Sequence, residues 1–152
     1  MANSPGVCVS FKVDQFNAVH AFGTTVIRAA TTPDTFKMAL YVATGSLSPT
    51  ATTAYSPTSE VSGAGYSPGG VAVTNAVAPT STGTTAYWTP SGNVVFTGVT
   101  LTTPFDTALL YNASQGNKAC SLYQFTAQTI VAGTLSLIPP TNAAGTALLN
   151  AN

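Results

Sequence analysis

The stretch that most constrains the fold covers residues 107–125 and reads TALLYNASQGNKACSLYQF. Two apolar runs, residues 108–111 and 119–125, flank a polar connection that contains Gly116-Asn117, a pair that adopts positive φ at low cost. This pattern predicts a β-hairpin. Neither face of its second arm is strongly polar, so we expect the hairpin to lie inside a larger sheet that is covered on both sides.

Short apolar stretches separated by Gly, Pro, Ser and Thr make up most of the remaining chain. Besides the two hairpin arms, the expected strands are residues 35–42, 71–78, 84–88, 93–101 and 135–138, with a short final strand at 147–149. We expect Pro104 to end one strand before the hairpin begins, and Ser81-Thr82-Gly83 to form a turn. About seven to nine short strands at this spacing predict an all-β fold, an antiparallel β-sandwich of jelly-roll or immunoglobulin-like type.

The one segment with helical periodicity covers residues 9–22, where apolar side chains recur at three- and four-residue spacing and Gly23 follows as a suitable C-terminal cap. We therefore predict a short N-terminal helix of about three turns. The chain then divides into an N-terminal arm, residues 1–23, and a β-sandwich domain, residues 24–152. The arm must pack on the sheet or on a neighbouring subunit, and its candidate contacts with such a subunit are Val9, Phe11, Phe16 and Phe22.

Charged residues are scarce, at 5% of the chain against about 25% in an ordinary soluble domain. Four basic and four acidic residues without clusters create no field that would attract nucleic acid or an anionic membrane, so we expect neither partner. No apolar run is long enough to span a bilayer, and the N-terminus lacks the pattern of a secretory signal. A surface with so little charge repulsion suits a protein that works inside an assembly.

Groups that could carry catalysis are few. His20 is the only histidine, and a triad would have to combine it with Asp14 or Asp34, yet no serine lies in a GxSxG motif. Cys8 and Cys120 form no CxxC pair, and we expect two buried thiols rather than a disulfide. The sequence therefore predicts no enzyme, no cofactor and no metal site.

Residues 43–70 form a long segment rich in Thr, Ser, Pro and Gly, and the only large side chains in it are Tyr55 and Tyr66. We expect an ordered loop held in place by these two tyrosines. Glu60 precedes a glycine-rich stretch, where it would accept hydrogen bonds from loop amides or, alternatively, meet a partner. Tyr55, Glu60 and Tyr66 are thus candidate organisers of the loop.

Several segments resemble one family. A strand TFKMALYV, a loop TTAY followed by EVSGAGY and GG, and a hairpin ALLYNASQGNKA occur in this order, as they do in a widespread group of small structural proteins of tailed bacteriophages. The matching positions are Phe36-Lys37, Ala39-Leu40-Tyr41, Thr53-Ala54-Tyr55, Glu60-Val61-Ser62-Gly63, Gly65-Tyr66 and Leu110-Tyr111-Asn112. The chain departs from the group at Pro90-Ser91-Gly92-Asn93 and in its charge-free residues 125–133.

The resemblance implies a virion component without enzymatic activity: a capsid decoration or cement protein that binds the major capsid protein on the capsid exterior after assembly in the host bacterial cytoplasm. We expect it to associate with itself as a homotrimer. An alternative is a host-recognition module of a tail or head fibre, which would bind glycans through Tyr87, Trp88 or the loop tyrosines. For that role Trp88 would have to be exposed, whereas a buried Trp is the commoner case in a sandwich. A neck or tail structural component is a further alternative.

Overall fold

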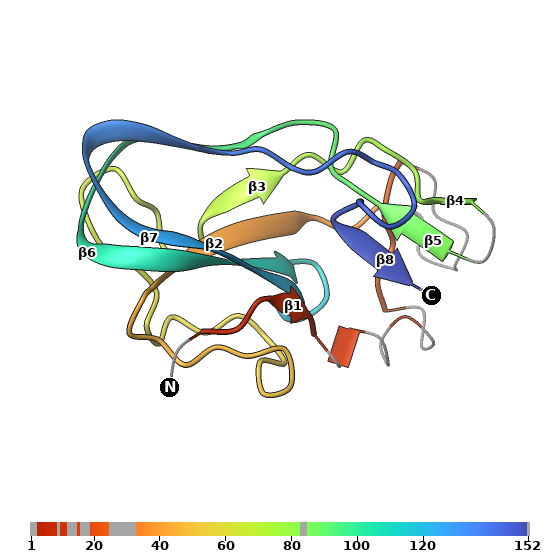
Figure 1. The fold of residues 1–152 in the computed structure, drawn as a ribbon, viewed down its shortest axis with the longest axis horizontal. Helices are drawn as coiled ribbons and strands as arrows, with labels where there is room; N and C mark the ends of the chain where they lie inside the picture. Colours follow the sequence, from red (N-terminus) through yellow and green to blue (C-terminus); the bar gives the residue numbers. More distant parts are fainter. Residues whose placement is uncertain are drawn as a thin grey trace.

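A computed structural model describes residues 3–8, 10–11, 15, 19–24, 33–82 and 85–151 (Figure 1). These residues form an all-β protein whose strands pair antiparallel, which confirms the predicted class. The strands are β1 (Gly6–Val7), β2 (Phe36–Val42), β3 (Val71–Val73), β4 (Thr80–Thr82), β5 (Thr85–Trp88), β6 (Val94–Asn112), β7 (Lys118–Leu137) and β8 (Leu149–Ala151). Five of them form one sheet in the order β1-β7-β6-β2-β3, and three form a second in the order β4-β5-β8.

The predicted hairpin is present and consists of β6 and β7. Leu110 lies opposite Ser121 and Asn112 lies opposite Lys118. The connecting turn contains Gly116 and Asn117, which have φ angles of 64° and 59°. Residues 105–112 of β6 are all buried, so this part of the hairpin is covered on both sides as expected.

The hairpin is much longer than the sequence suggested, and the expectation that Pro104 ends a strand is wrong. β6 runs through Pro104, where pairing with β7 is interrupted between Leu101 and Phe105. The missing N–H of the proline therefore costs no ladder hydrogen bond, and its carbonyl accepts the N–H of Ala43 at 2.9 Å. Register shifts near this point bend the hairpin, and Figure 1 shows its two parts on opposite sides of β2 and β3. We call residues 105–112 and 118–125 its proximal half, and residues 94–104 and 126–137 its distal half.

The predicted N-terminal helix is not seen as an element of the structure. Within residues 9–22, only Ser10, Phe11 and Gln15 have helical backbone among the described residues, and residues 19–22 are not helical. The reason lies in their hydrogen bonds: the N–H of Ala21 donates to Asp34 Oδ2 at 3.0 Å, and that of Gly23 donates to the side chain of Asn75. These amides thus bind side chains of other segments instead of helical carbonyls.

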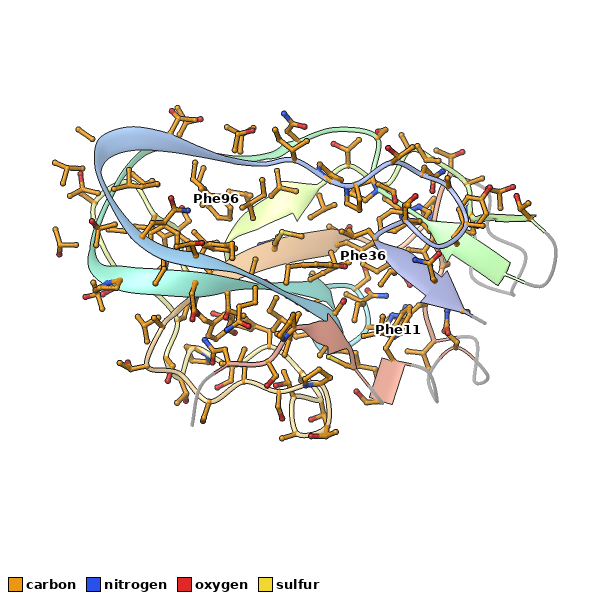
Figure 2. The ribbon with its side chains drawn as sticks, viewed as in Figure 1. Phe11, Phe36 and Phe96 are labelled. Atoms are coloured by element: carbon orange, nitrogen blue, oxygen red, sulfur yellow. The ribbon has the colours of Figure 1, made fainter. Side chains whose placement is uncertain are left out.

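The core joins the two sheets through aromatic rings. Phe22 stacks on Phe36 of β2 with ring centroids 4.6 Å apart, and it contacts Trp88 of β5 at 4.7 Å. Phe11 meets Phe22 edge to face at 5.8 Å. Figure 2 shows Phe36 near the middle of the molecule and Phe96 beneath the distal half of the hairpin. The described residues near the N-terminus contribute to the same core, since Cys8 and Phe11 are buried and β1 pairs with β7.

Candidate functional site

The long loop is held by a cluster around Glu60. The hydroxyls of Tyr55 and Tyr66 each donate a 2.7 Å hydrogen bond to the Glu60 carboxylate, and the N–H of Gly69 donates at 2.8 Å. Tyr66 Oη also accepts the N–H of Leu40, which ties the loop to β2. The structure thus brings the three candidate loop organisers together. Both carboxylate oxygens of Glu60 accept hydrogen bonds from donors of the same chain.

The tyrosines of this cluster have raised pKa values. Burial, followed by the hydrogen bond to Glu60, raises the pKa of Tyr55 to about 12. Burial and Glu60 also raise the pKa of Tyr66, and burial raises that of Tyr111, whose hydroxyl donates to Gly69 O at 2.7 Å. At neutral pH these hydroxyls are therefore protonated donors. Such a cluster can fix a loop, and its tyrosine hydroxyls do not exchange protons near pH 7.

A second polar cluster surrounds His20. Asn112 Nδ2 lies 3.1 Å from His20 Nδ1 and 2.8 Å from Asp34 Oδ2, while Asn112 Oδ1 accepts the N–H groups of Ser114 and Gln115. Because Nδ2 only donates, His20 Nδ1 is an acceptor here. Asp34 Oδ2 also accepts the N–H of Ala21. The cluster thus connects the N-terminal segment, the start of β2 and the end of β6.

Cys120 Sγ lies 3.9 Å from His20 Nδ1, so the structure places a thiol beside the histidine. The pairing of Cys with His is a common arrangement for nucleophilic catalysis. Here, however, Cys120 is 0% exposed, and a substrate could not reach its sulfur without opening of the core. Cys8 is likewise buried, and both are thiols rather than a disulfide. The geometry supports a packing and hydrogen-bonding role for the cluster.

Two of the four candidate subunit contacts lie within the described residues. Phe11 is 2% exposed, and Phe22 packs on the core of its own chain. Either side chain would have to leave this core to reach a neighbour. Val9 and Phe16 lie outside the described residues, as does Asp14.

The Tyr87-Trp88 pair does not form an exposed aromatic platform. Trp88 is buried and its Nε1 donates to Val77 O at 2.7 Å, as the sequence led us to expect. The hydroxyl of Tyr87 lies 3.1 Å from Thr82 Oγ1. Only one member of the pair is therefore accessible to a ligand.

An apolar groove of about 380 Å³ lies where β7 bends back on itself. Residues from both halves of this strand line it, and no charged residue does. Ile138, at its margin, is 77% exposed. The side chains that form its apolar wall include Tyr123, Phe125, Leu137, Ile138, Pro139 and Leu148. Exposed apolar surface of this kind is typical of an interaction site.

A second depression, of about 390 Å³, follows the long loop. It is lined mainly by small and hydroxyl-bearing side chains, among them Thr52, Thr53 and Thr58. None of the described residues that line it is charged.

No protein-family model, curated protein or solved structure matches the chain. Among the described residues, no group of three or more His, Cys, Asp or Glu side chains could hold a metal ion. In the same part of the chain, no helix has the length and apolar character needed to cross a membrane.

Sequence reasoning did not find the groove. Its lining comes from β2, from both ends of β7 and from residues after Pro139, which are far apart in the chain. The signal that could have suggested it is the run Leu135-Ser136-Leu137-Ile138, which ends in Pro139-Pro140 with an apolar residue at its exposed end.

Proposed function

We propose that the chain is a structural protein of a tailed-phage virion, specifically a capsid decoration or cement protein. It binds the major capsid protein and further copies of itself on the outside of the capsid, after assembly in the host bacterial cytoplasm. It acts by adhesion, without catalysis, cofactor or metal. The proposal rests on the sequence resemblance and on the character of the groove.

The observation that carries the proposal is an apolar, uncharged docking surface on a nearly uncharged protein. The groove has no ionisable lining apart from Tyr123, whose pKa burial raises, and whose hydroxyl donates to Leu148 O. With 5% charged residues in the whole chain, contacts with a lattice of neighbours cost little desolvation of ions. Repetition of a modest apolar contact over many copies gives a stable coat.

The finer description of the fold belongs to the same proposal. We infer an antiparallel β-sandwich in which the bent β6–β7 hairpin contributes strands to both layers. The hairpin's distal half lies across β2 and β3 from its proximal half (Figure 1), and Phe96 of the distal half stacks against Tyr66 with centroids 5.9 Å apart. A sandwich that exposes one side of its outer strands is a suitable base for surface contacts.

The glycan-binding alternative has less support. Trp88 is buried, and the hydroxyls of Tyr55 and Tyr66 are bonded to Glu60. A neck or tail component would use the same kind of adhesive surface, so the number of copies in a virion distinguishes it from a capsid protein.

The test uses capsids of the encoding phage prepared without this chain. Purified chain is added, and bound copies per capsid are counted by quantitative gel analysis and cryo-electron microscopy. Hundreds of copies support the proposal, whereas about a dozen would indicate a tail or neck position, and no binding would refute it.

Ile138→Lys places a charge at the groove and should weaken capsid binding at least about tenfold. The matched control is Thr102→Lys, which adds the same charge at an exposed position of β6. Equal occupancy by Ile138→Lys and Thr102→Lys would remove the groove from the proposed interface. A deletion of the N-terminal arm is not a suitable test, because this arm is part of the fold. Asn3 donates a 2.9 Å hydrogen bond to Asp106, and β1 is part of the sheet.

A further inference from the structure

The two outer edges of the distal half of the hairpin differ in how they are covered. The outer edge of β6 is closed by the glycine-rich loop, where the N–H of Thr100 donates to Ala64 O at 2.8 Å. The approach is so close that a Cβ atom at Gly63 would collide with the Thr100 carbonyl oxygen, and one at Gly65 with the Gly98 oxygen. This edge is therefore sealed by the chain's own backbone.

Within the described part of the chain, the outer edge of β7 is covered only near its proximal end. Gly6 and Val7 of β1 pair with Leu122 and Ser121, and the side chain of Gln124 donates to Asn3 O at 2.8 Å. Beyond this point, β7 has β6 as its only strand partner in the part of the chain that the structure describes. Residues 126–129 are all exposed, and so are most of residues 131–136. About half of β7 thus presents an open edge.

This open edge lacks charge and proline, two of the features that usually prevent strand pairing, while register shifts with β6 and a positive φ at Ala132 bend it locally. Natural edge strands carry lysine, proline or inward-pointing charge, which stop another chain from adding to the sheet. Residues 123–137, YQFTAQTIVAGTLSL, contain no charged residue and no proline. Val131, in this stretch, is 73% exposed. A strand of this kind is expected to be covered in the working state of the protein.

We propose that the distal edge of β7 pairs antiparallel with the same edge of a second copy, which forms a dimer about a two-fold axis. An antiparallel pair of identical edges is self-complementary, so it closes without leaving a further free edge of the same kind. Because the edge is uncharged, the two copies place no like charges opposite each other. The chain's formal net charge of +0 adds no overall repulsion.

Two features of the chain favour a second copy as the occupant. First, β1 already adds to the proximal end of this edge, with the Cys8 N–H donating to Cys120 O at 3.1 Å, so the edge accepts an antiparallel strand of this sequence. Second, Val131 of this edge is 73% exposed, and an added strand would give it a cross-strand neighbour. The pairing does not depend on the capsid role, and it predicts a dimer where the sequence led us to expect a trimer.

The test measures self-association of the full chain in the absence of capsids, by sedimentation equilibrium. The wild type should show a reversible dimer. Lysine at two exposed threonines of the edge, Thr129→Lys with Thr134→Lys, should raise the dimer dissociation constant at least about tenfold. The control pair, Thr97→Lys with Thr102→Lys, adds the same charge at exposed positions of β6 and should change it less than about twofold.

Hydrogen exchange of the unmodified chain provides a measurement that does not depend on how the variants fold. Backbone amides of residues 126–137 should exchange more slowly at high protein concentration than at low concentration, while those of residues 94–104 should not change. A wild type that stays monomeric at the highest soluble concentration, or forms a trimer, overturns the proposal. So does a dimer whose strength is the same in the edge variant and in the control variant.

Discussion

The proximal and distal halves of the β6–β7 hairpin contain the same two strands but differ in their surroundings. In the proximal half, every residue of β6 from 105 to 112 is buried, including Thr107 and Asn112. In the distal half, burial is confined to Val94, Phe96, Val99 and Leu101 among residues 94–104. The first pattern is that of a strand inside a sheet with both faces covered, and the second that of a strand with one face toward solvent.

The difference comes from what lies beside each half. β2 pairs with residues 105–112. The long loop covers the face of β2 that carries Tyr41, whose hydroxyl donates to Ser56 O at 2.7 Å. The distal half has the glycine-rich loop along one edge and no strand along the other within the described residues. A single hairpin thus supplies the centre of the core at one end and a largely exposed surface at the other.

The largest expected effect separates the two halves directly. Leu109→Ala, at a fully buried position of the proximal half, should lower the free energy of unfolding by about 2–5 kcal/mol. Val95→Ala, on the same strand but 42% exposed, should lower it by less than about 1 kcal/mol. Urea unfolding followed by tryptophan fluorescence measures both. Similar losses for the two variants would show that the halves are equally packed.

A smaller effect is expected where the loop seals the distal edge of β6. Gly63→Ala forces the loop away from Thr100, and should cost about 1–3 kcal/mol of unfolding free energy. Gly92→Ala is the control, since its Cβ would lie 3.9 Å from Thr74 Oγ1 and should cost little. If Gly63→Ala were as stable as Gly92→Ala in thermal melts, the β6 edge would not be sealed in the way described.

The smallest expected effect concerns the loss of folding stability at alkaline pH. The folded pKa of Tyr55 is raised to about 12 from the ordinary value of 10.0, so its contribution is fully present below pH 10 and is lost as the pH rises toward 12. Burial raises the pKa of other tyrosines too, among them Tyr41 and Tyr66, so the wild type should lose stability steeply in this range. Tyr55→Phe should make the fall shallower. Unfolding measured from pH 8 to pH 12 checks this, and an equally steep fall in the variant would contradict it.

Local sequence patterns predicted the hairpin and its turn because alternation and a Gly-Asn pair act over a few residues. The strand expected at residues 35–42 is β2, and the one expected at 147–149 corresponds to β8, slightly further along. The sequence of β2 alternates and places Lys37, Ala39 and Tyr41 on one face, yet Ala39 and Tyr41 are both buried under the long loop. The sequence of a strand does not reveal that a distant segment covers it.

Other expectations from the local sequence pattern were also wrong. The strand expected at residues 71–78 ends at Val73, and the residues expected to begin a turn, Ser81 and Thr82, lie in β4, which pairs with β5. The periodicity of residues 9–22 fits a helix, yet Asp34 and Asn75 bind amides near its end. At Ala21 and Gly23, contacts with distant segments prevailed over helical propensity.

The candidate site was predictable only in part. The sequence indicated Tyr55, Glu60 and Tyr66 together, because a lone carboxylate and two tyrosines stand out in a segment of small residues. The arrangement of His20, Asp34 and Cys120 depends on three segments that meet only in the folded chain. The groove requires the bend of β7, which follows from register shifts that no sequence motif announced.

The long loop is attached to the turn of the hairpin by main-chain hydrogen bonds, and this has a consequence for the order of folding. The N–H of Tyr55 donates to Asn117 O at 2.8 Å, and the N–H of Ala119 donates to Thr53 O at 3.0 Å. These bonds join residues more than sixty positions apart. The entropy lost when the intervening chain is closed is therefore offset only after the turn has formed. The loop should thus settle late, and a ribosome-bound chain that ends before residue 117 should lack these two attachments and hold the loop through its other hydrogen bonds, among them those to β2.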